Sequence, residues 1–349
     1  RLFRAASTAG VRAPIWTVSR QAQRVAEVDK VAPEQTLLWG FGRAVALEYP
    51  QVWGGLADVS GDAQEWAELV RQIPGLPRGE DQIVLRGRQV WVPRLVRRTG
   101  QPNPKPLELR SEATYLITGG LGSLGLEIAA HLAAHGAKQL VLTSRRAPNE
   151  AAQKRIADIT ATHGCAVRVM TADVANPHDI AHLIATVRAE SPALAGIVHA
   201  AGENSTTPLA TLEAAELDRV FGGKVWGAWY LSEAVEGLPL DFFVSTSSIS
   251  SVWGSYGQSA YGAANAFLDG LTWRLREQGI AGYSVNFGPW AAGMADPQAR
   301  AQLERRGVRT LPPADALAGR ATLADQLAAS GDPGGRSARL MRTSMISAP

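Results

Sequence analysis

The residue types best suited to catalysis gather between positions 245 and 265. Ser248 ends an apolar run that is typical of a strand, and Tyr261 opens a stretch of small residues that is typical of a helix. A serine at the carboxyl end of a strand, followed by a tyrosine on a helix, is the arrangement of a site that reduces a carbonyl group. That reaction needs a hydride from a nicotinamide and a proton for the alkoxide that develops.

A tyrosine is a poor proton donor at pH 7, because its pKa of about 10 is too high unless a nearby cation lowers it. Asn265 follows Tyr261 by four positions and therefore shares its helix face, but it carries no charge. The cation must come from another element. Lys224, in the preceding predicted helix, is the natural candidate.

A glycine-rich turn supplies the second motif. Gly120, Gly122 and Gly125 satisfy G-x-G-x-x-G between a predicted strand and a predicted helix, the context that a dinucleotide-binding turn requires. The glycines let the backbone approach a pyrophosphate, and the helix N-terminus offers N–H groups to it. The alternative is a glycine turn without a ligand. The positions predicted to line the dinucleotide here are Thr118, Gly119, Gly120, Gly122, Ser123, Leu124 and Gly125.

The next predicted strand indicates which dinucleotide. Arg145 stands 20 positions after Gly125, in Ser144-Arg145-Arg146, where a carboxylate would be expected for a ribose 2′-OH. A guanidinium instead pairs with a 2′-phosphate, so NADPH is favoured unless these arginines only solvate a loop.

Two further strand ends complete the predicted cofactor site. Asp173 and Val174 follow the third strand, where Asp173 could accept from the adenine amino group or cap the helix after Pro177. The fourth strand ends at His199 and continues into small residues that let a cofactor lie flat against the backbone, whereas His199 itself is predicted to be structural. Those small residues are Ala200, Ala201 and Gly202.

The predicted elements supply a scaffold that brings these strand ends together. Strand-like runs alternate with periodic helical segments, which implies an α/β fold with a parallel sheet and helices on both faces. The predicted strands are residues 115–118, 139–143, 166–171, 196–199, 241–246 and 282–286.

The upstream segment has a different character. Residues 1–98 alternate strand-like and helix-like runs but lack a G-x-G-x-x-G turn and any polar cluster suited to chemistry, which predicts a structural unit. Alternating prolines predict an extended linker over 99–112. The catalytic unit is then expected over 113–329 and a disordered tail over 330–349. With no strand before residue 15, the chain is expected to be part of a longer one.

Composition narrows the class of protein further. The 349 residues are 46% hydrophobic, enough for a packed core, and the net charge of +3 is too slight to indicate nucleic acid. No apolar run approaches the roughly 20 residues that span a bilayer, and the N-terminus does not resemble a signal peptide. The single cysteine, Cys165, excludes an internal disulfide framework and a cysteine-cluster metal site, so we expect a cytoplasmic protein without a metal.

Taken together, these motifs resemble the ketoreductase domains of modular (type I) polyketide synthases, within the short-chain dehydrogenase/reductase superfamily. That family places a lysine 37 positions and a serine 13 positions before its tyrosine, and Lys224 and Ser248 stand at those spacings from Tyr261. The serine spacing selects Ser248 over Ser247. The resemblance covers residues from about 13 to 325.

The resemblance implies a Rossmann-like doubly wound parallel sheet, preceded by a truncated, degenerate Rossmann-like structural subdomain. It implies that Tyr261 gives the proton, while Ser248 hydrogen-bonds the ketone oxygen. Lys224 would lower the pKa of the tyrosine, and Asn265 would order the site and a water relay. The expected reaction is NADPH-dependent reduction of a β-ketoacyl group, held on the phosphopantetheine arm of an acyl carrier protein, to a β-hydroxyacyl group. Other domains of the same synthase are expected partners, and nucleic acid and membrane are not.

Two positions resemble stereochemical markers of the family. Trp253, eight positions before Tyr261, is typical of A-type ketoreductases and predicts an L-configured β-hydroxyl, unless this indole only packs in the core. Gln258 replaces the histidine of epimerising relatives, so an α-methyl group is expected to keep its configuration. Two departures are Ser123 in the glycine turn and the absence of the expected final strand from 331–349.

Two alternatives remain open at the level of sequence. One is a stand-alone reductase of small ketones, which the cofactorless upstream unit disfavours. The other is a reductase-like scaffold or epimerase-only domain, which the intact set of Lys224, Ser248, Tyr261 and Asn265 disfavours.

Overall fold

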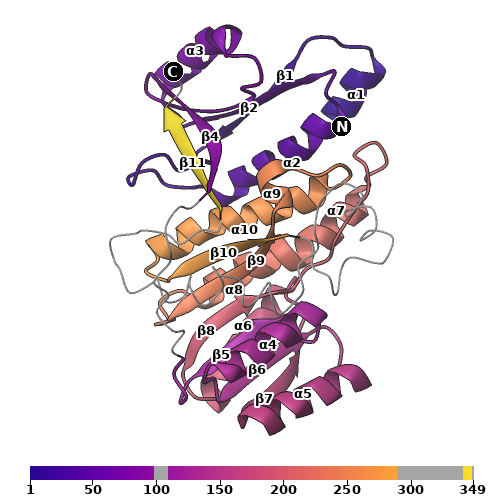
Figure 1. Cartoon of the computed structure of the whole chain (residues 1–349), viewed down its shortest axis with the longest axis vertical. Helices are drawn as coiled ribbons and strands as arrows, with labels where there is room; N and C mark the ends of the chain where they lie inside the picture. The colour runs from indigo at the N-terminus through magenta and orange to yellow at the C-terminus, as the bar shows by residue number, and fades with distance from the viewer. Residues whose placement is uncertain (98–108, 289–340, 348–349) are drawn as a thin grey trace.

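Six parallel strands form the larger of two sheets, in the order β10-β9-β8-β5-β6-β7 (Figure 1). The structure is a computed structural model that describes residues 1–97, 109–288 and 341–347. The strands confirm the predicted parallel α/β sheet, with ends shifted by a few residues. They are β5 (Thr114–Thr118), β6 (Gln139–Ser144), β7 (Ala166–Thr171), β8 (Leu194–His199), β9 (Phe242–Ser248) and β10 (Gly282–Phe287).

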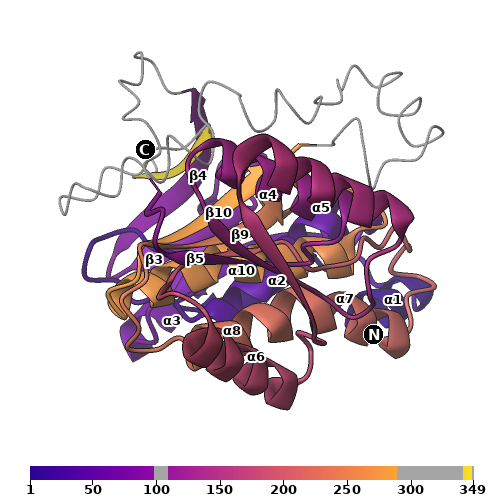
Figure 2. The same ribbon diagram turned by 90° about the horizontal axis from the view of Figure 1, so that it is seen from below.

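Helices cover both faces of this sheet (Figure 2). The central strand β5 is buried on both sides, with Leu116 in one apolar cluster and Tyr115 and Ile117 in the other. This two-sided burial explains why the strand reads as a continuous apolar run rather than an alternating one. One face carries α4 (Ser123–Ala134) and α5 (Glu150–His163). The other carries α6 (Pro177–Glu190), α7 (Ala214–Phe221), the π-helical turn η2 (Gly222–Trp226), α8 (Gly227–Ala234) and α10 (Ser259–Glu277).

The N-terminal residues, together with one strand from the C-terminal segment, build a second sheet in the order β1-β2-β3-β4-β11. Its first three strands are parallel, whereas β3 and β4 form an antiparallel hairpin. The strands are β1 (Ile15–Arg20), β2 (Trp53–Val59), β3 (Gln82–Arg86), β4 (Gln89–Arg97) and β11 (Met341–Ser347). The accompanying helices are α1 (Leu2–Thr8), α2 (Pro33–Glu48), α3 (Ala63–Gln72) and the short 3₁₀ turn Ile73–Gly75.

The C-terminal segment differs from its prediction. The sequence predicts a disordered tail over 330–349 without a final strand, of which residues 330–340 and 348–349 lie outside the described residues. Met341–Ser347 instead pairs antiparallel with β4. The physical reason is that β4 would otherwise present an edge of unpaired backbone N–H and C=O groups, which another strand can satisfy. Within the predicted linker 99–112, residues 109–112 form neither helix nor strand, and 98–108 lie outside the described residues.

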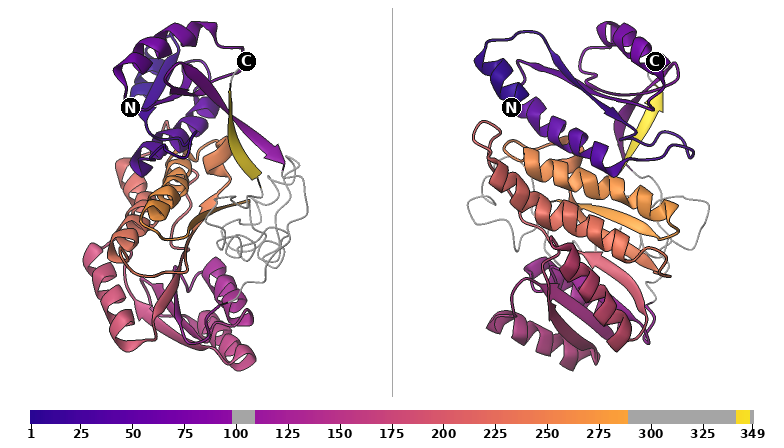
Figure 3. Two further views of the ribbon diagram at one scale, coloured as in Figure 1. Left: turned by 90° about the vertical axis from the view of Figure 1, so that its left-hand side faces the viewer. Right: turned by 180° about the vertical axis from the view of Figure 1, so that it is seen from behind.

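Helix α2 connects the N-terminal unit to the unit of the six-stranded sheet, because it packs along α10 (Figure 3). Thr36 Oγ1 of α2 donates a hydrogen bond to the carbonyl of Ala266 in α10, over 2.8 Å. Arg43 of α2 donates to the carbonyl of Ser251, in the short helix α9 (Ser250–Trp253) that precedes α10. The N-terminal unit therefore touches the elements that carry Trp253 and Tyr261.

Candidate active site

The predicted site residues converge at the carboxyl edge of the six-stranded sheet. Strands β6, β5, β8 and β9 are neighbours and parallel, so the segments that follow them lie side by side. In open α/β sheets this edge, where the chain order reverses, is where ligands bind. The fold thereby brings together the glycine turn, Arg145, the segment after His199, and Ser248.

The glycine turn after β5 has the shape that a dinucleotide requires. Gly119 has φ +63°, and a Cβ there would lie 2.7 Å from the backbone nitrogen of Ala201. A Cβ on Gly125 would lie 2.3 Å from the Gly119 carbonyl oxygen, so α4 packs against the turn only with glycine. By contrast, the space beside Gly122 is open except for that carbonyl at 3.3 Å.

The N-terminus of α4 is also free to accept an anion. Its N-cap is Gly122, no side chain caps it, and its first turn contains no acidic residue. The unpaired N–H groups and the partial positive charge of the helix terminus therefore point toward the turn. These observations fit a pyrophosphate bound between Gly119 and Gly125.

The remaining predicted cofactor residues follow β6, β7 and β8, at the same edge of the sheet as the turn. Arg145 is exposed after β6, beside half-buried Ser144. Asp173 Oδ1 accepts from the Ala175 backbone nitrogen at 3.0 Å, whereas Oδ2 accepts no hydrogen bond from the described part of the chain. The helix after Pro177 is capped by Asn176 rather than by Asp173. The residues that complete this border are buried Val174, half-buried Ala200 and Ala201, and exposed Gly202.

Lys224 reaches the site from a π-helical turn. Such turns are rare and often occur at functional sites. Here the turn lies between α7 and α8 and buries Lys224, whose Nζ donates to the Thr246 carbonyl of β9 over 2.9 Å. Gly202 makes room for it, because a Cβ there would lie 2.7 Å from Lys224 Cγ. Burial lowers the pKa of Lys224 to about 8, although Asp269 opposes that change.

Tyr261 lies between Ser248 and Asn265 and is buried. Burial raises the pKa of Tyr261, while the hydrogen bonds of Asn265 and Ser248 act to lower it. The Lys224 Nζ stands 5.4 Å from the centre of the tyrosine ring, over its face. The role of Lys224 in lowering this pKa stays a prediction, with its ammonium held between the Thr246 carbonyl and the tyrosine ring.

The two adjacent serines, Ser247 and Ser248, have different hydrogen-bond partners. Ser247 Oγ donates to the carbonyl of Asn265 at 3.1 Å and accepts from Asn286 at 3.1 Å, so it joins strand to helix. Ser248 is instead the serine that hydrogen-bonds Tyr261. Asn265 Nδ2 donates to the Tyr261 carbonyl, and Asn265 Oδ1 is buried without a partner among the described residues. A buried acceptor of this kind suits an ordered water.

Asp269 is a site residue that the sequence reasoning missed. Its carboxylate accepts from Ser251 Oγ at 2.6 Å, from Ser284 Oγ at 2.5 Å and from Asn286 Nδ2 at 3.0 Å. Asn286 in turn lies 3.2 Å from the carbonyl oxygen of Ser248. A signal was available, because Asp269 follows Asn265 by four positions and therefore lies on the same helix face as that site residue.

Trp253 and Gln258 lie in the segment between Ser248 and Tyr261, at the end of α9 and at the N-cap of α10. The Trp253 side chain is 53% exposed, which argues against the alternative that it only packs in the core. Gln258 Nε2 donates to Asn204 Oδ1 at 3.1 Å and so joins the segment before Tyr261 to the segment after β8. Glu48, at the end of α2, joins the same two segments by accepting from the backbone nitrogens of Leu209 and Gly257.

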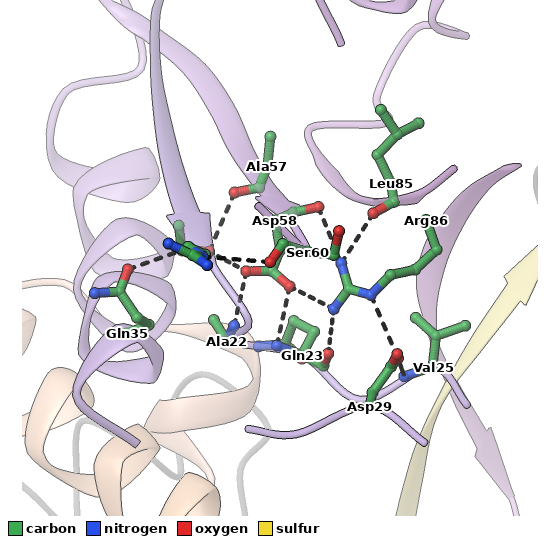
Figure 4. A network of polar contacts seen from close by, with 12 residues as sticks. Ala22, Gln23, Val25, Asp29, Gln35, Ala57, Asp58, Ser60, Leu85 and Arg86 are labelled. Carbon is green, nitrogen blue, oxygen red and sulfur yellow. Dashed lines mark hydrogen bonds and ion pairs between the residues drawn. The ribbon is translucent and has the colours of Figure 1, made fainter. Parts of the chain in front are cut away.

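At the equivalent edge of the N-terminal sheet, carboxylates of the protein accept hydrogen bonds from backbone N–H groups, as Figure 4 shows for Asp58. Buried Asp58, near the end of β2, accepts from the backbone nitrogens of Ala22 and Gln23 and pairs with Arg86 at 2.8 Å. Glu65 of α3 accepts from the backbone nitrogens of Ser60 and Gly87 at 2.5 and 2.7 Å. Protein carboxylates thus take the backbone N–H groups that a phosphate would need.

Neither a metal-binding cluster nor a membrane-spanning helix occurs among the described residues. Residues 1–97, 109–288 and 341–347 contain no group of three or more His, Cys, Asp or Glu that could hold a metal ion. Among the helices that the structure describes, none combines the length and apolar character needed to cross a membrane.

Comparison with known proteins agrees with this fold. The family model of the KR domain matches residues 113–292. The pikromycin polyketide synthase component PikAIII of Streptomyces venezuelae is 40% identical over 316 residues, which cover 88% of this chain and 20% of that protein. A solved structure of A-type ketoreductases from a modular polyketide synthase has a TM-score of 0.84 and 36% identity, and covers 94% of this chain and 69% of its own. A C2-type ketoreductase has a TM-score of 0.84 and 34% identity, with 94% and 71% covered.

The parallel sheet and its glycine turn form a Rossmann fold like that of the short-chain dehydrogenases/reductases. Within that class, the chain belongs to the KR-domain family, the ketoreductase domains of modular polyketide synthases. It is thus an NAD(P)-dependent type of oxidoreductase domain, and it spans about a fifth of the length of PikAIII.

Proposed function

We propose that this domain reduces the β-keto group of an acyl chain to an L-configured β-hydroxyl, with NADPH as the cofactor and with the chain carried as a thioester on an acyl carrier protein. The observation that carries the proposal is the position of Tyr261. Its hydroxyl lies with Ser248 and Asn265 at the sheet edge that also carries the glycine turn, and Lys224 is buried against its ring.

In this proposal the protein handles the proton. NADPH, when bound, supplies the hydride. Ser248 hydrogen-bonds the ketone oxygen, and Tyr261 gives that oxygen the proton it needs as it becomes an alkoxide. Asn265 holds a water through its unpartnered Oδ1, and Lys224 brings positive charge beneath the ring. Burial keeps the tyrosine protonated until the alkoxide, a stronger base, forms beside it.

The choice of NADPH follows from Arg145. The exposed guanidinium stands after β6, and residues 143–146 contain no carboxylate to receive a ribose 2′-OH. Removing this side chain is the direct test. Arg145→Ala is expected to weaken NADPH binding and to leave NADH binding nearly unchanged in fluorescence titrations. Equal effects on the two nucleotides would overturn the cofactor assignment.

The stereochemical part rests on Trp253, since similar structures include both A-type and C2-type ketoreductases. In this proposal the half-exposed indole blocks entry of the acyl chain from one side of the site. The chain then enters from the other side and presents the opposite face of its ketone to the hydride. Gln258 is held by Asn204 and offers no imidazole for proton exchange at the α-carbon. We therefore propose that an α-methyl group keeps its configuration during the reaction.

The N-terminal unit is proposed to be a degenerate Rossmann-like subdomain with a structural role. Asp58 and Glu65 accept hydrogen bonds from backbone N–H groups at its sheet edge, which supports a structural role. The linker is proposed over residues 99–112, and the catalytic unit over residues 113–329. Other domains of a longer synthase are the proposed partners, because the relatives with this sequence are components of polyketide synthases.

The decisive experiment offers the protein NADPH and a racemic 2-methyl-3-ketoacyl thioester, with chiral analysis of the alcohol. We expect NADPH oxidation and an L-hydroxyl product. Absence of turnover by folded protein would overturn the reductase and favour the scaffold or epimerase alternative, whereas preference for small free ketones would favour a stand-alone reductase. A D-hydroxyl product would overturn only the role of Trp253. The Trp253→Ala variant is expected to give a mixture of alcohols.

A further inference from the structure

An ion pair crosses the sheet edge above the glycine turn. Glu203 follows the segment after β8, and Arg145 follows β6, whereas β5 lies between those two strands. Arg145 Nη2 lies 2.6 Å from Glu203 Oε1. The pair therefore bridges two neighbours of β5, over the point where the chain leaves β5 into Gly119.

Glu203 has a second cationic partner. Its other carboxylate oxygen, Oε2, accepts from Arg219 of α7. Partial burial acts to raise the pKa of Glu203, but the hydrogen bonds of Arg219 and Arg145 lower it overall, so the carboxylate is ionised at neutral pH. The Arg145 side chain remains 61% exposed despite the pairing, so its guanidinium can still reach a ligand.

We propose that Glu203 is an internal competitor of the cofactor: its carboxylate holds Arg145 across the sheet edge until the 2′-phosphate of NADPH takes over the guanidinium. This inference rests on the proposed use of NADPH. A phosphate is the stronger partner, because it carries more negative charge than a carboxylate and offers guanidinium the same paired oxygens.

Arg219 lowers the free-energy cost of moving Arg145 from Glu203 to the phosphate. When Arg145 moves to the phosphate, Glu203 keeps its hydrogen bond to Arg219, so no carboxylate is left without a cation. A ligand without a 2′-phosphate cannot make the exchange and leaves the pair closed. Glu203 thereby reduces affinity for the nucleotide that carries the 2′-phosphate, and with it the preference for that nucleotide over one that lacks the phosphate.

The test measures binding and does not depend on turnover. Adenosine 2′,5′-bisphosphate and AMP, which differ by the 2′-phosphate, are titrated calorimetrically into the whole chain. Glu203→Gln is expected to tighten bisphosphate binding about two- to fivefold relative to AMP, the range expected for loss of an exposed ion pair. Glu236→Gln, which removes an exposed carboxylate elsewhere, is the matched control and is expected to change neither constant.

A second variant predicts the opposite sign. Arg219→Gln leaves Glu203 with Arg145 alone and is expected to weaken bisphosphate binding, but only while Glu203 is present. In the double variant with Glu203→Gln that effect is expected to disappear, which separates an action through Glu203 from direct contact between Arg219 and phosphate.

Each outcome has one interpretation. Weaker or unchanged bisphosphate binding by Glu203→Gln, relative to AMP, overturns the competitor role. A wild-type protein that does not distinguish the two ligands overturns the NADPH proposal instead. If the wild type prefers the bisphosphate but Glu203→Gln binds both ligands as the wild type does, the NADPH proposal stands and only the competitor role of Glu203 is overturned.

Discussion

Gly40 of α2 and Gly262 of α10 meet backbone to backbone, one residue after the proposed proton donor Tyr261. A Cβ on Gly40 would lie 2.1 Å from the carbonyl oxygen of Gly262, and a Cβ on Gly262 would lie 2.9 Å from that of Gly40. Only glycine lets the two helices approach this closely. The N-terminal unit thus sets the position of the helix that carries Tyr261 and Asn265.

Replacement of Gly40 by alanine is expected to destabilise the fold and slow reduction. The added methyl group must push α2 from α10, and overpacking of this kind costs about 1–3 kcal/mol. Gly75→Ala is the matched control, since a Cβ there meets nothing within 4 Å. Thermal unfolding and turnover are the measurements. An unchanged unfolding temperature for Gly40→Ala would show that the contact tolerates a side chain.

Tyr261→Phe is expected to reduce turnover by a factor on the order of 10²–10⁴, the usual contribution of a positioned acid. Nucleotide binding should remain, because the ring stays in place and only the hydroxyl is lost. Tyr256→Phe is the control, as that side chain is 58% exposed. Turnover within tenfold of the wild type would exclude Tyr261 as the donor.

Lys224→Met is expected to abolish reduction and yet to stabilise the fold near pH 7. Burial lowers the pKa of Lys224 from 10.5 to about 8, so the unfolded chain binds this proton more tightly than the folded protein does. Stability of the wild type therefore rises with pH between about 8 and 10.5 as the folded lysine becomes neutral. The gain from the variant should shrink over that window in unfolding experiments at several pH values. A gain that is independent of pH would contradict burial of a charged lysine.

Asp269→Asn tests the group behind Ser248. The amide presents an N–H₂ where Ser251 and Ser284 donate, so hydrogen bonds are lost and stability is expected to fall by about 1–3 kcal/mol. A positioning role predicts a lower kcat with unchanged NADPH binding, measured well below the unfolding temperature. If kcat falls only as far as the folded fraction does, Asp269 is structural alone.

The sequence predicted the larger sheet well because its signals are local. Each strand is a short apolar run, and the turn after residue 118 carries its glycines where the backbone needs them. The strand 341–347 was missed because its pairing with β4 joins segments more than 200 positions apart. The π-helical turn around Lys224 was also missed, since nothing in Gly222–Trp226 distinguishes it from an α-helix.

What the sequence determined by itself is the chemistry that is available: Tyr261, Ser248, Lys224 and Asn265 at fixed spacings, with a glycine turn and Arg145. What the tertiary structure decided is how those groups are used, because distances between segments far apart in the chain depend on packing. Only the fold bonds Lys224 to Thr246 beneath the tyrosine ring, and only the fold sets Glu203 against Arg145. The physical reason is that burial and pairing, which control charge, are properties of neighbours in space.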